Sequence, residues 1–344
     1  MSEIIECVPN FSEGKNSKIV EEIAQAISSV SQVKLLNVEA DKDHNRTVIT
    51  FAGKIEPVKE AAYKATETAI NLIDMTKHVG EHPRLGAVDV VPFIPVSGVS
   101  MEECVSISRE YGKMVADNLN IPVFLYGETA TTPQRKNLSD IRKGEYEGLE
   151  SKLSKPEWKP DFGKAVFNHK SGALVTGARF FLIAYNINLD ISDKSIAHEI
   201  ALRIREIGRP KKNEKGEFVL DEQGKKIMIP GTLKYIKAMG VLLERYHLSQ
   251  VSMNVINYLE TPPHIAFEEV KKQAESLGAK VIGSEIVGLT PKAALVVAGR
   301  FYAEKQGKSI SNDDNELIKI AIESLGLNQF EEFIPQKKII EYMI

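Results

Sequence analysis

Cysteine is scarce in this sequence, which excludes the classes of protein that depend on it. The chain has 344 residues but only two cysteines, Cys7 and Cys104, and they lack C-x-x-C spacing. A disulfide framework and a zinc ribbon are therefore excluded, and we expect two reduced, mostly buried thiols. No apolar run reaches membrane-spanning length, and acidic residues stand where a signal peptide needs basic ones. We expect a soluble, cytoplasmic protein without a membrane partner.

The sequence also lacks an excess of charge of either sign. With 44 basic and 47 acidic residues its net charge is -3, which gives no general attraction to nucleic acid. No Walker A motif and no G-x-G-x-x-G motif occurs, so nucleotide binding is unsupported, and a G-x-S-x-G serine-hydrolase elbow is missing as well. What is present is an apolar fraction of 43%, ample for the core of one large or two medium domains.

The first half of the chain alternates short apolar runs with segments of helical periodicity. The expected elements are a strand at 3–8, a helix at 17–30, a hairpin of strands at 33–38 and 46–52, a helix from Pro57, and a strand at 87–96. This order is β-α-β-β-α-β, the ferredoxin-like arrangement in which two helices cover one face of an antiparallel sheet.

The second half repeats the same order. Its expected elements are a strand at 179–189, a helix capped by Ser192, strands at 232–241 and 250–258, a helix opened by Pro262 and Pro263, and a strand at 279–286. We therefore predict an α+β fold of two duplicated ferredoxin-like (βαββαβ) subdomains. Their boundaries are residues 1–178 and residues 179–344.

Polar stretches interrupt this pattern. Residues 129–161 are rich in Lys, Glu, Ser and Pro, which is typical of surface structure or of a linker. Residues 211–226 form a mostly charged insertion with two glycines, which indicates a mobile hairpin or loop without a specific role. A terminal helix is expected at 312–325, and the mostly apolar tail after it is expected to dock on the body.

The chemistry-bearing residues gather on a loop directly ahead of the predicted strand at 87–96. His78, Glu81 and His82 match the H-x-x-E-H zinc motif, but Gly80 and Pro83 disfavour the helix that this motif requires, so we expect no metal. The alternative is that His82 is a general acid or base, because imidazole titrates near neutral pH.

The neighbours of His82 suit acid-base chemistry. Glu81 or Asp89 could orient the imidazole, and Arg84 could hold an anionic substrate. A loop histidine that only caps a helix or binds a backbone carbonyl is an equally good interpretation of the spacing alone. Glu39, at the end of a strand, could favour a cationic substrate group.

Glycines at 163, 172 and 177 bracket a second polar segment. Such a loop lets backbone amides approach a planar or anionic ligand closely, with Lys170 or Arg179 available to meet carboxylates. A plain connection between domains fits the composition equally well.

Several long stretches carry a resemblance to one family. They are VPNFSEG at 8–14, NRTV at 45–48, GEHPRLGAVDVVPFIPV at 80–96, VFLYGE at 123–128, EYEGL at 145–149, PDFG at 160–163 and TGARFFLIAYNINL at 176–189. In this order they resemble the glutamate formimidoyltransferase family, which includes the formiminotransferase domain of formimidoyltransferase-cyclodeaminase. The resemblance implies a duplicated ferredoxin-like fold with folate bound in a cleft between the two subdomains.

The resemblance also implies a reaction and its residues. A formimidoyl group passes from N-formimidoyl-L-glutamate to the co-substrate tetrahydrofolate, giving 5-formimidoyltetrahydrofolate and L-glutamate, in histidine degradation. His82 maps onto the family's catalytic histidine, and Glu39 stands where family members have an aspartate one methylene shorter. The implied folate-binding residues are Gly163, Lys164, Ala165, Val166, Phe167, Asn168, His169, Lys170, Ser171 and Gly172. Arg84 and Arg179 are the candidates for binding the substrate carboxylates.

Some alternatives stay open at this point. The donor group could be formyl rather than formimidoyl, the protein could bind folate without catalysis, or it could be the zinc hydrolase. Animal relatives carry an additional cyclodeaminase domain, and this chain ends too early to hold one, so a separate cyclodeaminase is expected. The oligomeric state is open, with a homodimer as the first candidate.

Overall fold

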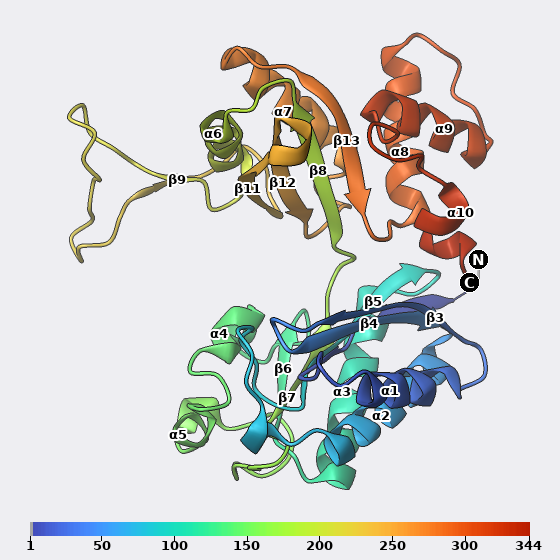
Figure 1. Ribbon diagram of the computed structural model, residues 1–344, viewed down its shortest axis with the longest axis vertical. Helices are drawn as coiled ribbons and strands as arrows, with labels where there is room; N and C mark the ends of the chain where they lie inside the picture. Colours follow the sequence, from blue (N-terminus) through green and yellow to red (C-terminus); the bar gives the residue numbers. More distant parts are fainter. Residues whose placement is uncertain (1–2) are drawn as a thin grey trace. The chain divides into compact units, whose positions relative to one another are not determined.

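Residues 3–344 are described by a computed structural model, and their contacts divide them into two units (Figure 1). Unit 1 runs to Arg179 and includes Ile344, and unit 2 comprises Phe180–Met343. Each unit contains a β-sheet with helices packed on it. The predicted α+β class with two sheet-containing subdomains is therefore confirmed.

The sheet of unit 1 has a mixed topology. Its strands are β1 (Ile4–Cys7), β2 (Asn10–Phe11), β3 (Val33–Asp41), β4 (Arg46–Gly53), β5 (Val88–Ser97), β6 (Val123–Gly127) and β7 (Leu174–Ala178). β1 and β2 both lie between β4 and β5, like one strand interrupted at residues 8–9, and β3 pairs with the other edge of β4. These antiparallel pairs are consistent with the split-βαβ order. β7 and β6 extend the sheet beyond β5 in parallel.

One face of this sheet is covered by the long helices α1 (Ser17–Ser28), α2 (Ile55–Leu72) and α3 (Met101–Leu119). On α1, Val20, Ile23 and Ile27 are buried at helical spacing, which is the amphipathic pattern seen in the sequence. A capping box formed by Ser100 and Glu103 starts α3. The core under these helices contains large buried side chains, among them Ile5, Phe51, Phe93 and Tyr111.

The opposite face of β5, β7 and β6 is covered by the short helices α4 (Leu138–Arg142) and α5 (Leu149–Leu153). Ile141, Leu149 and Leu153 from these helices are buried against the sheet. The linker interpretation of residues 129–161 is therefore wrong, because this stretch packs on unit 1. Its few apolar residues are enough for two short helices, whose other faces stay polar.

Unit 2 repeats the antiparallel order of unit 1. Its strands are β8 (Ile183–Leu189), β11 (Ile236–Leu243), β12 (Leu248–Val255) and β13 (Val281–Val287), in the order β11-β12-β8-β13. Its crossover helices are α6 (Lys194–Ile204) and α7 (Pro263–Ser276). Asp193, rather than the predicted Ser192, caps α6, because its carboxylate accepts the backbone N–H of Ser195 at 2.8 Å.

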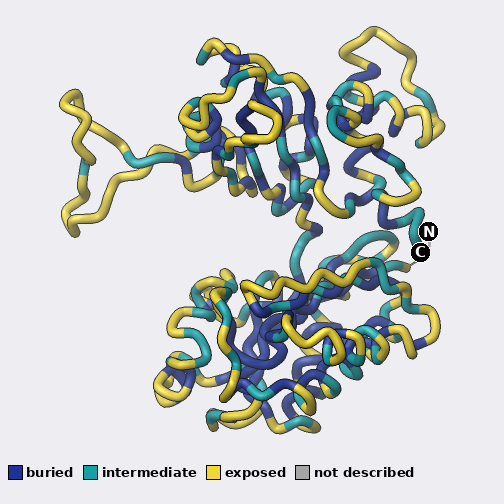
Figure 2. The backbone as a smooth tube through the Cα atoms, viewed as in Figure 1, coloured by how far each residue is buried: buried dark blue, intermediate teal, exposed yellow. Residues whose placement is uncertain are grey.

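The insertion at 211–226 is an exposed excursion from unit 2 (Figure 2). Its base is the pair β9 (Arg209–Pro210) and β10 (Met228–Ile229). After β13 follow α8 (Lys292–Lys305), which the sequence analysis did not identify, α9 (Asp314–Leu325) and α10 (Pro335–Lys338). The tail docks as predicted, with Ile339 and Ile340 fully buried.

Short 3-10 turns connect these elements at Met75–Lys77, Pro133–Arg135, Pro156–Trp158, Glu244–Tyr246 and Ile340–Tyr342. Among the helices formed by residues 3–344, none has the length and apolar character needed to cross a membrane.

Candidate active site

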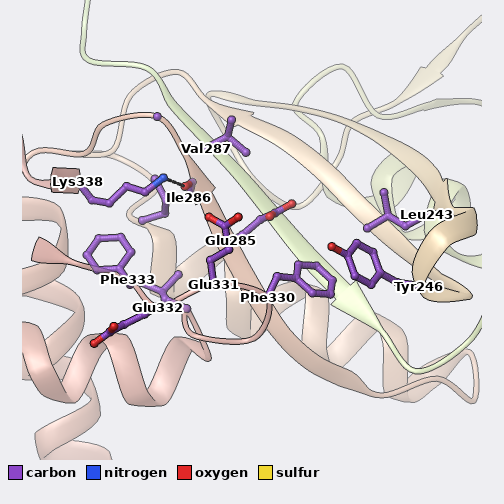
Figure 3. A pocket seen from close by; sticks show the side chains of 12 residues that line it. Leu243, Tyr246, Glu285, Ile286, Val287, Phe330, Glu331, Glu332, Phe333 and Lys338 are labelled. Carbon is purple, nitrogen blue, oxygen red and sulfur yellow. Dashed lines mark hydrogen bonds between the residues drawn. The ribbon is translucent and has the colours of Figure 1, made fainter. Parts of the chain in front are cut away.

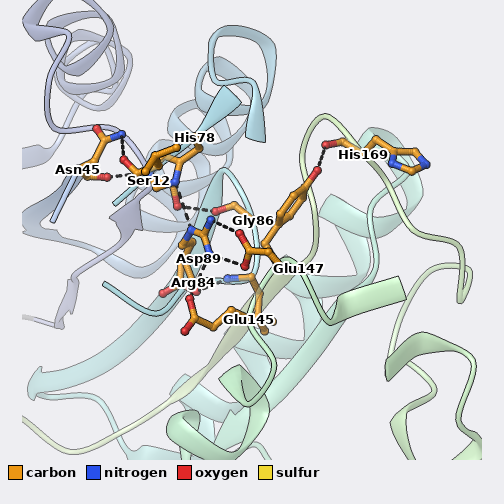
Figure 4. Close-up of polar contacts among 12 residues, drawn as sticks. Ser12, Asn45, His78, Arg84, Gly86, Asp89, Glu145, Glu147 and His169 are labelled. Carbon is orange, nitrogen blue, oxygen red and sulfur yellow. Dashed lines mark hydrogen bonds and ion pairs between the residues drawn. The ribbon is translucent and has the colours of Figure 1, made fainter. Parts of the chain in front are cut away.

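The loop that carries His82 is fixed to the turn between β3 and β4 (Figure 4). His78 Nε2 donates to the carbonyl of Asn45 at 2.9 Å, and Asn45 Nδ2 donates to the carbonyl of Val79 at 3.0 Å. A Cβ atom on Gly80 would lie 2.4 Å from the carbonyl oxygen of His44, so only glycine fits there. Two stretches of the family resemblance, NRTV and GEHPR, therefore lie against each other.

His78 is occupied on both ring nitrogens. Besides the Nε2 bond to Asn45, its Nδ1 accepts a hydrogen bond from Arg84 Nε at 3.2 Å. Burial, with a smaller contribution from the charge of Arg84, lowers the pKa of His78, which fits this neutral tautomer. His78 therefore has no lone pair left for a metal. Across residues 3–344, no group of three or more His, Cys, Asp or Glu side chains that could hold a metal ion is found.

His82 is half-buried and lines a small pocket. The other lining residues are Phe11, Ser12, His44, Asn45, Arg46, His78, Arg84 and Asp89. The imidazole of His82 lies edge-on to that of His44, with ring centroids 6.1 Å apart. Its Nδ1 atom is buried and has no hydrogen-bond partner. Among residues 3–344, this ring nitrogen of His82 is therefore left without an acceptor or donor.

The pKa of His82 is lowered, first by burial and then by the charges of Arg46 and Arg142. The charge of Asp89 and the backbone of Pro83 oppose this shift. At neutral pH the imidazole is therefore neutral and able to accept a proton.

Asp89 links the His82 loop to α4. Its Oδ1 accepts the backbone N–H of Leu85 at 2.9 Å, and its Oδ2 accepts hydrogen bonds from Nε of Arg142 at 3.0 Å and from Nη2 of the same guanidinium. Within residues 3–344, no hydrogen bond joins His82 to Asp89 or to Glu81. Asp89 therefore acts on His82 through its charge and through the shape of the loop.

Arg84 is occupied by two carboxylates. Its Nη1 and Nη2 atoms bind Glu147 at 2.8 and 2.6 Å, and Nη1 also lies 3.1 Å from Glu145 (Figure 4). The guanidinium is itself buried, with 8% of its side chain exposed. This arrangement disfavours the predicted role of Arg84 as a direct ligand of a substrate carboxylate. Instead, Arg84 joins two of the stretches that carry the family resemblance, because it lies in GEHPR while Glu145 and Glu147 lie in EYEGL.

Residues 163–172 form a largely exposed loop. The end of this loop is hydrogen-bonded to the His82 loop. Gly172 and Gly86 form an antiparallel bridge, Ala87 N–H donates to the Ser171 carbonyl at 2.9 Å, and Ala173 N–H donates to the Leu85 carbonyl at 3.1 Å. The segment is therefore held at a fixed point beside the GEHPR loop. Beyond Ala173 the predicted loop becomes β7, whose side chains are buried.

Aromatic side chains brace the middle of this segment. The hydroxyl of Tyr146 donates to the carbonyl of His169, and the ring of Phe167 lies 5.2 Å from Tyr146 and 4.7 Å from His169. Val166 is 65% exposed. The segment thus presents backbone and apolar surface to solvent, as a platform for a planar ligand would.

Glu39 and Arg46 lie on the same face of the unit 1 sheet. Glu39 pairs with Val48 and Asp41 with Arg46, while Ile49 and Phe51 of β4 point to the long helices. Because side chains alternate along a strand, Arg46, Val48 and Glu39 face away from those helices. Glu39 is exposed, and its charge acts on Arg46.

Arg179 lies further along β5 than the His82 loop. Its backbone N–H donates to the carbonyl of Phe93 at 3.2 Å, and its charge acts on Glu6 and Tyr126. Asp89, next to the His82 pocket, is four positions earlier on the same strand, or roughly 13 Å away. Unit 1 therefore does not bring Arg179 into the pocket of His82.

Arg142 and Asn10 of this neighbourhood were missed by the sequence analysis. Arg142 comes from the polar stretch 129–161, and Asn10 accepts a hydrogen bond from Arg46. The VPNFSEG and NRTV stretches were a usable signal for Asn10 and Arg46. No local pattern distinguishes Arg142 from a solvated surface arginine.

A second pocket lies in unit 2 (Figure 3). The rings of Tyr246 and Phe330 stack in it at 4.3 Å, and Glu285 accepts hydrogen bonds from the side chains of Asn186 and Gln250. Most of its charged side chains are carboxylates, which would repel an anionic ligand. The His82 pocket is therefore the stronger candidate for proton-transfer chemistry on an anion.

Comparisons with known proteins match both units to one family. A sequence model of the formiminotransferase domain, N-terminal subdomain, matches residues 4–179, and one of the formiminotransferase domain matches residues 184–344. The chain is 48% identical to formimidoyltransferase-cyclodeaminase of Dictyostelium discoideum, over 100% of this chain and 61% of that protein. It thus spans less than two thirds of the length of this relative.

Shorter relatives are covered almost completely. The chain is 40% identical to glutamate formimidoyltransferase of Streptococcus pyogenes serotype M1, over 88% of this chain and 94% of that protein. It is 41% identical to glutamate formimidoyltransferase of Thermoplasma acidophilum, over 88% of this chain and 93% of that protein.

Proposed function

The chain belongs to the formiminotransferase family, and from this we propose that it transfers the formimidoyl group of N-formimidoyl-L-glutamate to tetrahydrofolate. The products are 5-formimidoyltetrahydrofolate and L-glutamate, and the step belongs to histidine degradation. The observation that carries the proposal is the neutral, half-buried imidazole of His82, in a pocket bounded by stretches that resemble the family. Tetrahydrofolate is the co-substrate, and the mechanism needs no metal.

His82 moves one proton in this reaction. The N5 amine of tetrahydrofolate attacks the formimidoyl carbon, and the new C–N bond produces a tetrahedral intermediate with a positive charge on N5. The neutral imidazole accepts the N5 proton and gives it to the amine of the glutamate moiety. The old C–N bond then breaks and L-glutamate leaves as a neutral amine.

Two further groups of residues complete the proposed site. Glu39, on the sheet face that also carries Arg46, stabilises the positive amidinium carbon of the donor. The extra methylene of Glu39, compared with the family's aspartate, lets its carboxylate reach further from the strand. Residues Gly163–Gly172 bind the folate, supported by the Tyr146, Phe167 and His169 side chains behind them.

The choice of donor can be tested directly. Purified protein is incubated with tetrahydrofolate and either N-formimidoyl-L-glutamate or N-formyl-L-glutamate, and L-glutamate release and the folate product are both measured. We expect glutamate and 5-formimidoyltetrahydrofolate to form in equal amounts with the first donor. Faster release from the formyl donor would establish formyl transfer instead. Tight folate binding with no release from either donor would make the protein a folate carrier.

The proposal includes the domain boundary, the location and the partners of the protein. The boundary between the subdomains lies at residues 178–179. The protein acts in the cytoplasm. The proposed partners are the two small-molecule substrates, a second copy of the chain in a homodimer, and a separate cyclodeaminase that acts on the folate product.

A further inference from the structure

Arg46 is a basic side chain of the His82 pocket whose charge has no direct counterion. Its Nη2 atom donates to the neutral amide oxygen of Asn10, and its Nε atom is buried without a hydrogen-bond partner. Among residues 3–344, no carboxylate oxygen lies within 4.0 Å of the Arg46 guanidinium nitrogens. A buried N–H without an acceptor is unfavourable, so the protein alone leaves this arginine incompletely bonded.

The neighbouring arginines differ from Arg46 in this respect. Arg84 is bound by Glu145 and Glu147, and Arg142 is bound by Asp89. Both guanidinium groups are therefore neutralised and geometrically fixed. Arg46 lines the same pocket as His82 and keeps an Nε N–H without an acceptor.

We propose that Arg46 binds one carboxylate of the formimidoylglutamate donor. This inference rests on the proposed function and names the residue that selects a donor with a carboxylate. A planar guanidinium matches a carboxylate through two parallel N–H···O bonds, and Nε with an Nη atom supplies such a pair. The proposal replaces Arg84 in that role.

Carboxylate binding at Arg46 has a consequence for the histidine. The charges of Arg46 and Arg142 both lower the pKa of His82, while Asp89 raises it. The other polar groups that line the pocket are Ser12, His44, Asn45, His78 and Arg84. The charge of Arg84 is paired with Glu145 and Glu147. A donor carboxylate on Arg46 cancels one of the two positive charges and raises the pKa of His82 in the complex. The imidazole then holds the N5 proton long enough to deliver it to the departing amine.

The test compares Arg46→Gln, Arg46→Lys and wild type in the full-length protein. The donors are N-formimidoyl-L-glutamate and two analogues that each lack one carboxylate, N-formimidoyl-4-aminobutyrate and N-formimidoyl-norvaline. We expect Arg46→Gln to raise the KM for N-formimidoyl-L-glutamate roughly 10- to 100-fold, as the loss of a charge-assisted pair does. The KM for tetrahydrofolate stays within about twofold.

The analogues show which carboxylate is bound. Wild type discriminates against the analogue that lacks the bound carboxylate, and Arg46→Gln loses this discrimination for that analogue only. Arg46→Lys keeps the charge but not the two-point geometry, so its KM for N-formimidoyl-L-glutamate is expected to lie between those of wild type and Arg46→Gln. Arg109→Gln is the matched control, because Arg109 lies on α3 and binds the carbonyl of Thr129.

A pH profile adds a measurement that general damage to the fold would not reproduce. In wild type, the acid limb of kcat/KM reports His82 in the free enzyme, and in Arg46→Gln this limb moves to higher pH because one positive charge is gone. An unchanged KM for N-formimidoyl-L-glutamate and an unmoved acid limb in a folded, active Arg46→Gln would overturn the inference. If wild type forms no product yet binds the donor through Arg46, measured by calorimetry, the proposed function falls and the carboxylate site stands.

Discussion

Gly86 and Gly172 form an antiparallel bridge that joins the loop of His82 to the end of the predicted folate segment. The backbones approach so closely that a Cβ atom on Gly86 would lie 2.4 Å from the carbonyl oxygens of Ser171 and Ala173. The loop of His82 and the predicted folate segment therefore share one fixed point. A change at this point should affect both loops.

Gly172→Ala is expected to weaken folate binding and to destabilise the protein. Gly172 has a φ of +69°, and an added Cβ would lie 2.1 Å from the carbonyl oxygen of Leu85. Strain and clash together should lower the free energy of unfolding by about 3 kcal/mol. Urea denaturation and tetrahydrofolate binding by calorimetry measure the two effects.

Gly278→Ala separates the backbone strain at positive φ from the steric clash with Leu85. Gly278 has a similar φ of +77° but no atom within 4 Å of the added Cβ, so only the backbone strain applies. We expect a loss of about 1 kcal/mol there. Equal losses for the two variants would show that the close contact with Leu85 is unimportant.

Glu147→Gln should loosen the support of Arg84. The variant removes one charge from the two-point pair with the buried guanidinium, while Glu145 stays within 3.1 Å. Because the Glu147 side chain is largely exposed, the expected loss is only about 1 kcal/mol of unfolding free energy. Glu150→Gln, an exposed acid in the first turn of α5, is the control. A Glu147→Gln protein as stable as this control would refute the assignment.

Acid should destabilise the protein through His264. Burial lowers the pKa of His264 to about 4, against 6.5 in the unfolded chain, and its Nδ1 atom has no partner. The unfolded chain therefore binds more protons between these values, and the stabilising contribution present above pH 6.5 is lost as the pH falls towards 4. At pH 5 the loss should be about 2 kcal/mol.

The contribution of His264 is measured as the difference in pH dependence between wild type and a variant that lacks this histidine. Unfolding free energies of wild type and His264→Asn are measured at pH 7.5 and at pH 5, with His247→Asn at an exposed turn as the control. The pH dependence of His264→Asn should be smaller than that of wild type by about 2 kcal/mol. Parallel profiles for the three proteins would remove His264 from the explanation.

Removing the charged hairpin tip should leave the fold and the proposed activity intact. The tip is exposed, and its backbone hydrogen bonds stay within residues 211–227, for example from Asn213 N–H to the Glu217 carbonyl and from Val219 N–H to the Lys211 carbonyl. Replacing residues 213–224 by a short Gly-Ser turn should change unfolding free energy by less than about 0.5 kcal/mol. Transfer activity should be retained. A large loss of activity with unchanged stability would assign the hairpin a part in ligand binding.

Local periodicity was sufficient to predict most of the regular elements. The spacing of Val20, Ile23 and Ile27 predicted α1, and two β-branched runs separated by a turn predicted β3 and β4. These signals are local, because an element that buries one face repeats its apolar residues with its own period. The duplicated β-α-β-β-α-β order could be predicted from the amino-acid sequence for the same reason.

The partners of charged side chains could not be predicted in the same way. Arg84 was expected to face a substrate, yet Glu145 and Glu147 occupy it from a stretch far along the chain. Arg142 looked like a solvated residue of a linker, yet it binds the buried Asp89. A charge pattern shows that an arginine is present, whereas its counterion depends on which distant segments the fold brings together.

The measurement that tests the account most directly is single-turnover glutamate release by His82→Ala. The proposed proton transfer predicts a rate roughly 10²- to 10⁴-fold below wild type, with tetrahydrofolate affinity nearly unchanged. His198→Ala, at an exposed position on α6, is the histidine control and should behave like wild type. Glutamate release from His82→Ala at the wild-type rate would contradict the central role given to this imidazole.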